Sequence, residues 1–220
     1  MKNYNTVIFD LDGTLLDTLD DLTAGVNYCM KKYGGPLYQK EEVREKVGNG
    51  IYPLIERSLP GGQNHPHYGD CLREFPIYYK EHMLDNTKPF PGILTMLAKL
   101  EQKQYKLAVV SNKFDAAVKE LCGTFFSNTI HVAIGESPSI RKKPAPDTVF
   151  QAMRELDSEP DTCLYIGDSE VDIQTAANAG IPCISVDWGF KTVDFLKAHG
   201  ARRIVSAPEE LYEHIVNQTF

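Results

Sequence analysis

Short apolar runs rich in valine and isoleucine recur along this chain and alternate with helical patterns, and this alternation most constrains its fold. Six runs are candidate strands: Thr6–Phe9, Leu107–Val110, Ile130–Ile134, Cys163–Ile166, Cys183–Val186 and Arg203–Ser206. Strands that are apolar along their whole length are buried on both faces, which is typical of parallel sheets covered by helices. The sequence therefore predicts an α/β fold with a Rossmann-like, mostly parallel sheet.

Apolar residues at helical spacing occupy the segments between several of these runs. We expect helices over 91–103, with Pro91 at the first helical position, and over 148–156. A further helix is expected over 171–179, where Gly180 provides the C-terminal stop.

One stretch, from about residue 17 to residue 86, contains no convincing strand. It predicts helices over about 18–33, 41–47, 51–59 and 68–84, and Pro76 is expected to kink or split the last of them. An all-helical block that follows the first strand of an α/β sheet indicates an inserted domain. We therefore expect a core domain of residues 1–16 and 87–220 and a helical domain of residues 17–86.

Charge and cysteine content limit the partners and the compartment. The 220 residues include 23 Lys and Arg against 30 Asp and Glu, a net charge of −7, and such a surface repels nucleic acid and anionic membranes. No apolar run approaches the roughly 18 residues of a membrane span. The five cysteines are widely spaced and odd in number, which favours reduced thiols in a cytoplasmic protein. Monomer and homodimer both remain open.

Polar residues follow the ends of the first, second and fourth predicted strands. They are Asp10 and Asp12, then Ser111-Asn112-Lys113, then Gly167-Asp168-Ser169, and Lys143 precedes a predicted helix. Ligands bind at the carboxyl ends of strands in open parallel sheets. Carboxylates suit Mg²⁺, whereas hydroxyl, amide and ammonium groups suit phosphoryl oxygens. The sequence therefore predicts a site for Mg²⁺ and a phosphate group.

The two carboxylates that follow the first strand also have a purely structural interpretation. Asp10 and Asp12, at i and i+2 on extended backbone, would project to the same side and need a cation or a shared proton to relieve their repulsion. Alternatively, they end the strand and cap the turn that follows.

Several neighbouring residues have a structural alternative too. Ser169 is favoured as a helix N-cap, and Asp172 is either an acidic residue of the first helical turn or outer support for the metal. Thr14 either orients the loop or is a turn hydroxyl, and Lys113 is expected at the surface.

The polar motifs resemble those of the haloacid dehalogenase superfamily. The matching motifs occur in the family's order: Asp10-Leu-Asp-Gly-Thr-Leu15, Ser111-Asn112, Lys143-Pro144 and Gly167-Asp-Ser-Glu-Val-Asp172. The helical block resembles the family's inserted cap, and its segment from Glu42 to Arg57 looks most like phosphoglycolate phosphatases. The resemblance implies a Mg²⁺-dependent phosphatase that acts on a small phosphorylated metabolite, with 2-phosphoglycolate as the leading candidate.

The resemblance also implies a role for each core residue. Asp10 would be the nucleophile that forms an aspartyl-phosphate, and Asp12 would act as general acid and then general base. Mg²⁺ would bind the Asp10 carboxylate, the Asp12 backbone carbonyl and Asp168. The phosphoryl oxygens would be held by Ser111, Asn112 and Lys143.

Substrate choice would then fall to the helical domain. Gly48-Asn49-Gly50 could present backbone N–H groups of Asn49 and Gly50 to a carboxylate, although a plain interhelical turn is the alternative. Arg57 is a candidate cationic partner, or else a solvated residue of a helix face. Closure would hinge near Leu15–Thr18 and Asn86–Pro89.

Alternative functions remain within and outside this superfamily. Asp12 argues against a dehalogenase, and the absence of histidine from Asp17–Thr23 disfavours a sugar-phosphate mutase. A pyrophosphatase, a nucleotidase or a sugar-phosphate phosphatase stays open. A non-catalytic binding or regulatory protein would be expected to lose Asp10, Asp12, Lys143 or Asp168, and this sequence retains all of them.

Overall fold

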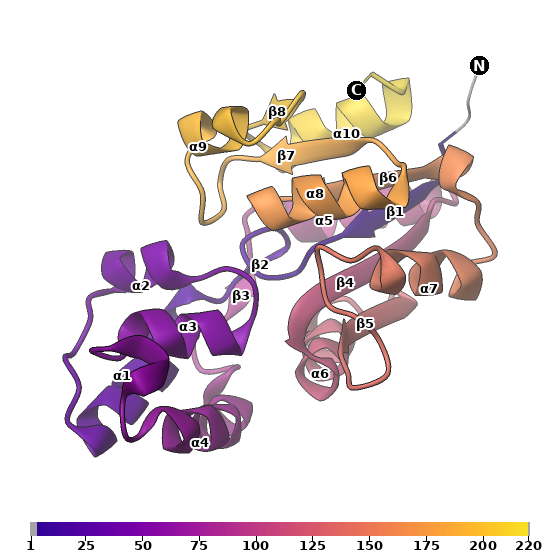
Figure 1. Cartoon of the computed structure of the whole chain (residues 1–220). Coiled ribbons are helices and arrows are strands. Elements are labelled where there is room, and N and C mark those ends of the chain that lie inside the picture. Colours follow the sequence, from indigo (N-terminus) through magenta and orange to yellow (C-terminus); the bar gives the residue numbers. More distant parts are fainter. Residues whose placement is uncertain (1–3, 220) are drawn as a thin grey trace. The chain divides into compact units, whose positions relative to one another are not determined.

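The computed structural model of the chain describes residues 4–219, which divide into two compact units (Figure 1). The core unit comprises Met1–Leu16 and Pro89–Phe220, and the helical unit comprises Asp17–Lys88.

A six-stranded sheet forms the centre of the core unit. Its strand order is β5-β4-β1-β6-β7-β8, and the neighbouring strands pair in parallel. The strands are β1 (Thr6–Phe9), β4 (Lys106–Phe114), β5 (Val132–Glu136), β6 (Cys163–Gly167), β7 (Cys183–Val186) and β8 (Ile204–Val205). The predicted α/β fold with a parallel sheet is therefore confirmed.

Helices cover both faces of this sheet. They are α5 (Ile93–Gln102), α6 (Asp115–Phe125), α7 (Asp147–Glu155), α8 (Glu170–Ala179), α9 (Val193–Ala198) and α10 (Pro208–Asn217), with a short 3₁₀ helix at Pro160–Thr162. Figure 1 shows α7 and α8 in front of the sheet and α5 behind it. On the face covered by α7 and α8, the buried strand residues Ile8, Val110 and Ile134 pack with Val149 and Ala176 of those helices. The wholly apolar strands thus reflect burial on both sides.

The boundaries of several core elements differ from those expected from sequence. Helix α5 begins at Ile93 rather than Pro91, because Gly92 adopts a φ of 91° and serves as the N-cap. Strand β4 runs on to Phe114 and so includes the polar residues after its apolar part. Gly180 ends α8 with a left-handed φ of 72°, as predicted.

The helical unit contains the four predicted helices. They are α1 (Leu19–Tyr33), α2 (Lys40–Lys46), α3 (Ile51–Ser58) and α4 (Tyr68–His82), with a 3₁₀ helix at Gly62–Asn64. Helix α4 continues through Pro76 without a break, so the expectation that this proline could split the helix is wrong. Phe75 and Tyr79 on either side of Pro76 are buried, and their packing holds both halves in one helix.

Short strands β2 (Leu16–Asp17) and β3 (Lys88–Pro89) form a two-stranded sheet where the chain passes between the units. Close to them, the buried carboxylate of Asp21 accepts hydrogen bonds from the backbone N–H groups of Asn86 and Thr87 at 2.8–3.1 Å and from both of their side chains. The first helix of the helical unit is thereby tied to the unit's last residues. Among the described residues, none of the helices has the length and apolar character needed to cross a membrane.

Candidate active site

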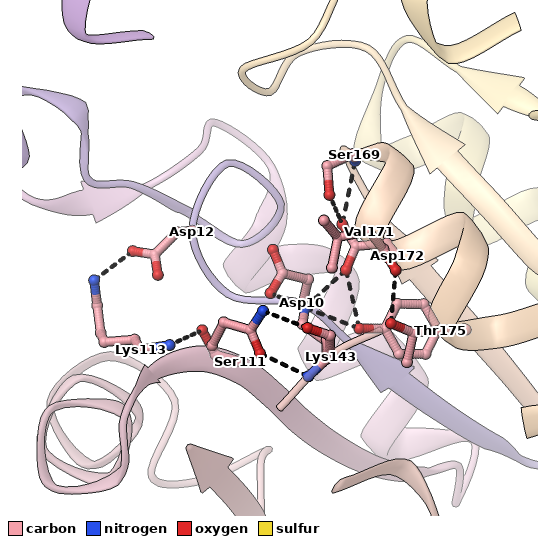
Figure 2. A network of polar contacts seen from close by, with 11 residues as sticks. Asp10, Asp12, Ser111, Lys113, Lys143, Ser169, Val171, Asp172 and Thr175 are labelled. Atoms are coloured by element: carbon pink, nitrogen blue, oxygen red, sulfur yellow. Dashed lines mark hydrogen bonds and ion pairs between the residues drawn. The ribbon is translucent and has the colours of Figure 1, made fainter. Parts of the chain in front are cut away.

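The polar motifs of the core unit meet at one edge of the sheet. Strands β4, β1 and β6 are neighbours, and Ser111, Asp10 and Asp168 lie in or directly after them. Since parallel strands end at the same edge, residues more than 150 positions apart in sequence come together there. Figure 2 shows the resulting network.

Lys143 is the centre of this network. Its Nζ lies 2.7 Å from Asp10 Oδ1, 2.7 Å from Asp172 Oδ1 and 3.1 Å from the hydroxyl of Tyr165. All of these side chains are buried, and each N–H of the ammonium group has an acceptor. Removing one partner of a buried charge pair leaves the other uncompensated, so the cation and its two carboxylates depend on one another.

The backbone of Lys143 is fixed by Asn112. The Asn112 side chain donates from Nδ2 to the Lys143 carbonyl at 2.9 Å and accepts at Oδ1 from the Lys143 N–H at 2.8 Å. Asn112 belongs to β4, so this pair of hydrogen bonds attaches the Lys143 loop to the sheet. Ser111 is buried beside it, and its Oγ accepts from the backbone N–H of Lys113 at 3.2 Å.

Three buried carboxylates form an acidic cluster. One oxygen from each of Asp10, Asp168 and Asp172 lies within 4.8 Å of the others. Asp168 also accepts a hydrogen bond from the backbone N–H of Phe190 at 2.6 Å. Gly13 and Gly189 flank this residue closely enough that a Cβ at either position would overlap the Asp168 carboxylate.

The electrostatics of this cluster favour binding of a cation. Burial raises the pKa of Asp10 from 3.8 to about 7; Lys143 opposes the rise, and Asp172 and Asp12 add to it. Burial, followed by the charges of Asp172 and Asp10, also raises the pKa of Asp168 well above its usual value. Hard oxygen donors that repel one another suit Mg²⁺, because a divalent ion favours their charged forms.

Asp172 uses its two oxygens differently. Oδ2 accepts from the backbone N–H of Ser169 at 3.1 Å and from its hydroxyl at 2.5 Å, which completes a capping box at the start of α8. Oδ1 faces Lys143 and Tyr165. The predicted cap at Ser169 is confirmed, and Asp172 combines a place in the first helical turn with a contact to the central lysine.

Asp12 lies apart from this cluster and pairs with a different lysine. Lys113 Nζ is 2.7 Å from Asp12 Oδ1, and their side chains are only 6% and 17% exposed. Strand β1 ends at Phe9, so extended-strand geometry does not apply to Asp10 and Asp12. Figure 2 shows Asp12 turned toward Lys113, whereas Asp10 is turned toward Lys143.

The expectation that Lys113 lies at the surface is wrong. Because β4 extends through residues 111–113, Lys113 lies two positions after Ser111 on the same strand. The strand shifts its register between Val110 and Phe114, so the alternation of a regular strand could not have identified Lys113. Tyr165 was also missed, because its place in an apolar strand indicates packing rather than a polar contact.

Thr14 has a hydrogen bond within the core unit, and Arg57 has one within the helical unit. Thr14 is buried, and its carbonyl accepts from Trp188 Nε1 at 3.0 Å. Asn49 and Gly50 have positive φ values of 66° and 86°, and Gly50 is the N-cap of α3. Arg57 is exposed and donates to the Lys46 carbonyl at 2.9 Å, so its side chain satisfies a carbonyl of the last residue of α2.

Comparisons with known proteins identify relatives over most of the chain. Residues 7–186 match the family model of haloacid dehalogenase-like hydrolases. A phosphoglycolate phosphatase of Pseudomonas putida is 34% identical over 191 residues, which cover 84% of this chain and 70% of that protein. One from Aquifex aeolicus is 32% identical over 190 residues, covering 84% and 85% of the two chains.

A solved structure from Lactobacillus delbrueckii subsp. bulgaricus shows the same fold. It superimposes with a TM-score of 0.92 at 38% identity and covers 97% of this chain and 98% of its own. That protein is described as a candidate phosphoglycolate phosphatase.

Proposed function

The chain belongs to the haloacid dehalogenase-like hydrolases, and we propose that it hydrolyses a small phosphate monoester through an aspartyl-phosphate on Asp10, with 2-phosphoglycolate as the leading substrate. The observation that carries this proposal is the buried Asp10 carboxylate at the end of β1, held 2.7 Å from Lys143 within the acidic cluster. A fixed cation beside a carboxylate orients it as a nucleophile.

Two displacements at phosphorus account for the reaction. In the first, a carboxylate oxygen of Asp10 bonds to phosphorus while the bond to the alcohol oxygen breaks, and Asp12 gives that oxygen a proton. In the second, a water oxygen bonds to phosphorus while the bond to the Asp10 oxygen breaks, and Asp12 takes a proton from that water, which regenerates both side chains. Such proton transfers contribute about 10²–10⁴-fold to a rate.

Positive charge and hydrogen-bond donors would meet the phosphoryl oxygens. The Ser111 hydroxyl accepts from Lys113 N–H and retains its own proton to donate. Asn112 would act mainly by holding the backbone of Lys143. Asp10, Asp168 and the Asp12 carbonyl would hold Mg²⁺, which supplies positive charge against the phosphate dianion.

We assign substrate choice to the helical unit, acting as a cap. Asn49, Gly50 and Arg57 are its candidate contacts to the non-phosphate part of the substrate, and hinges at Leu15–Thr18 and Asn86–Pro89 would allow it to close. Slower hydrogen exchange in these hinges on binding of phosphoglycolate to Asp10→Asn would support closure. Unchanged exchange in both segments would contradict it.

Phosphate release from a panel of esters tests the function. We expect a preference for 2-phosphoglycolate over hexose phosphates, nucleotides and pyrophosphate, loss of release with chelator, and a fall of at least about 10³-fold in Asp10→Asn. Preference for another ester would retain the chemistry and replace the substrate. Full activity of Asp10→Asn would refute the nucleophile, and no release from any ester would favour a mutase or a non-catalytic protein.

A further inference from the structure

The two catalytic carboxylates of the proposed mechanism are each served by a separate lysine. Lys143 contacts Asp10, and Lys113 contacts Asp12. We propose that Lys113 is a positioning residue, whose ammonium group holds the Asp12 carboxylate in the orientation needed to exchange a proton with the leaving-group oxygen. This inference rests on the proposed function, because it takes Asp12 as the general acid and base.

The geometry of the pair restrains Asp12 strongly. The 2.7 Å contact joins Lys113 Nζ to Asp12 Oδ1, and we assign proton exchange to the other carboxylate oxygen, Oδ2. The lysine side chain is 6% exposed, so its ammonium group has little opportunity to leave Asp12 for solvent. A charge-assisted hydrogen bond in such a partly buried place is shorter and stronger than a neutral one.

The lysine is held by the last part of strand β4. Lys113 lies where this strand shifts register between Val110 and Phe114, and its backbone N–H donates to the hydroxyl of Ser111 at 3.2 Å. Ser111 is the proposed donor to the phosphoryl group, so a single strand end places both the phosphate ligand and the partner of Asp12. A small displacement of a reacting group can reduce a rate 10²-fold, which gives this arrangement a direct effect on turnover.

The role of Lys113 in orienting Asp12 has a distinctive dependence on the leaving group. An alkoxide leaves poorly and needs a proton in the transition state, whereas p-nitrophenolate leaves without one. If Lys113 serves the proton transfer, its loss should slow the release of alcohols and spare the release of p-nitrophenolate. A lysine that merely supports the fold, or one that binds the phosphoryl group, would affect both.

The experiment compares Lys113→Met and Lys113→Arg with the matched control Lys106→Met. Lys106 lies at the other end of β4, where Nζ donates to the Leu156 and Asp157 carbonyls. The substrates are 2-phosphoglycolate, ethyl phosphate and p-nitrophenyl phosphate, each with saturating Mg²⁺. Ethyl phosphate has a poor leaving group but no carboxylate, so it separates proton transfer from recognition of the substrate's second charge.

In single turnovers, we expect Lys113→Met to lower the rate of alcohol release from phosphoglycolate and from ethyl phosphate by about 10–100-fold and to change the rate of p-nitrophenolate release less than about threefold. Single turnovers are needed because the second displacement, which also uses Asp12, follows the release of every leaving group. Lys113→Arg should recover part of the loss, and Lys106→Met should match the wild-type protein. Equal losses on all three substrates, or no loss on any, would overturn the proposal. A loss confined to phosphoglycolate would also overturn it, because Lys113 would then bind the substrate carboxylate.

Asp12→Asn separates this proposal from the function on which it rests. If the function is right, this variant shows the same leaving-group dependence as Lys113→Met, with a larger loss. If Asp12→Asn retains activity on the alkyl esters, the acid–base assignment itself fails. If it shows the expected dependence and Lys113→Met does not, only the positioning role fails.

Discussion

The hydroxyl oxygen of Tyr165 lies 3.1 Å from Nζ of Lys143, at the buried end of the network. It accepts from the ammonium group and donates to Asp172 Oδ1 at 3.0 Å. Burial, the largest influence, and the nearby carboxylates raise the pKa of this phenol well above its usual value, although Lys143 opposes them. The hydroxyl therefore keeps its proton and supplies the third acceptor of the ammonium group.

Tyr165→Phe should preserve the packing of β6 and remove only this acceptor and donor. We expect kcat to fall about 10-fold through a looser Lys143 and the free energy of unfolding to fall by about 1–3 kcal/mol. Steady-state kinetics and urea unfolding measure the two effects. Thr175→Val is the control, because it removes a buried hydroxyl of α8 that bonds only to the Val171 carbonyl at 2.6 Å. Equal kinetic losses in both variants would argue against a specific role for Tyr165.

Without Mg²⁺, the raised pKa of Asp10 should make stability depend on pH. The folded protein keeps the Asp10 proton up to a pKa of about 7, whereas the unfolded chain loses it near 3.8. The folded state therefore binds more protons between these values, and the free energy of unfolding contributed by this group falls as pH rises through that window. The loss is complete only well above pH 7, where the folded protein has also released the proton.

Asp10→Asn cannot ionise at this position and should remove that contribution. In chelator, we expect the stability of the variant relative to the wild-type protein to be higher at pH 8 than at pH 5, by on the order of 1 kcal/mol or more, in addition to a pH-independent cost of losing the Lys143 contact. Thermal unfolding across this range measures the relative stability. A relative stability that falls from pH 5 to pH 8 would show that Asp10 is ionised when buried without metal.

Binding of Mg²⁺ should stabilise the folded protein through the acidic cluster. At 100 times its dissociation constant, a ligand adds about 2.7 kcal/mol to the free energy of unfolding. We expect Mg²⁺ to raise the Tm of the wild-type protein and to raise that of Asp168→Asn much less. Asp187→Asn should respond like the wild-type protein, because Asp187 contacts Ser206 outside the cluster. Equal shifts in all three proteins would place the metal elsewhere.

Neighbouring aspartates in α1 should differ sharply in their effect on stability. Asp21 is buried and accepts the N–H groups of Asn86 and Thr87, so Asp21→Ala leaves them unsatisfied and should cost about 1–3 kcal/mol. Asp20 forms an exposed pair with Lys40, and Asp20→Ala should cost under about 1 kcal/mol. Chemical unfolding of both variants measures the contrast. Similar losses of stability in the two variants would mean that water satisfies the N–H groups of Asn86 and Thr87 when the Asp21 carboxylate is removed.

The sheet and the helical unit could be predicted from sequence because their signals are local. Apolar runs such as Cys163–Ile166 and helical spacing in residues 18–33 report which backbone faces are buried. The core motifs could be located because a parallel sheet brings strand ends to one edge. Helices α6, α9 and α10 were not predicted, although Ala117, Val118 and Leu121 form the buried face of α6.

The pairing of charges could not be predicted, because it depends on which side chains meet across the sheet. Asp172 is separated from Lys143 by 29 residues and Lys113 from Asp12 by 101, and no periodicity encodes either contact. Asn112 illustrates the same limit: its residue type indicates a phosphate ligand, but its side chain hydrogen-bonds to the backbone carbonyl and N–H of Lys143. Residue type indicates a possible chemistry, and only the fold selects the partner.

The double hydrogen bond between Asn112 and Lys143 has a consequence for protein engineering. Lys143 lies in the connection between β5 and α7, but these two hydrogen bonds fix its backbone to strand β4. The position of its ammonium group therefore depends on the sheet more than on the rest of the connection. The exposed residues Pro138 and Ser139 of that connection precede the attachment point, whereas Ile140 packs against the core. The exposed pair can therefore be varied or extended without moving the ammonium group. A new recognition loop could therefore be introduced at this position while Lys143 keeps its place in the active site.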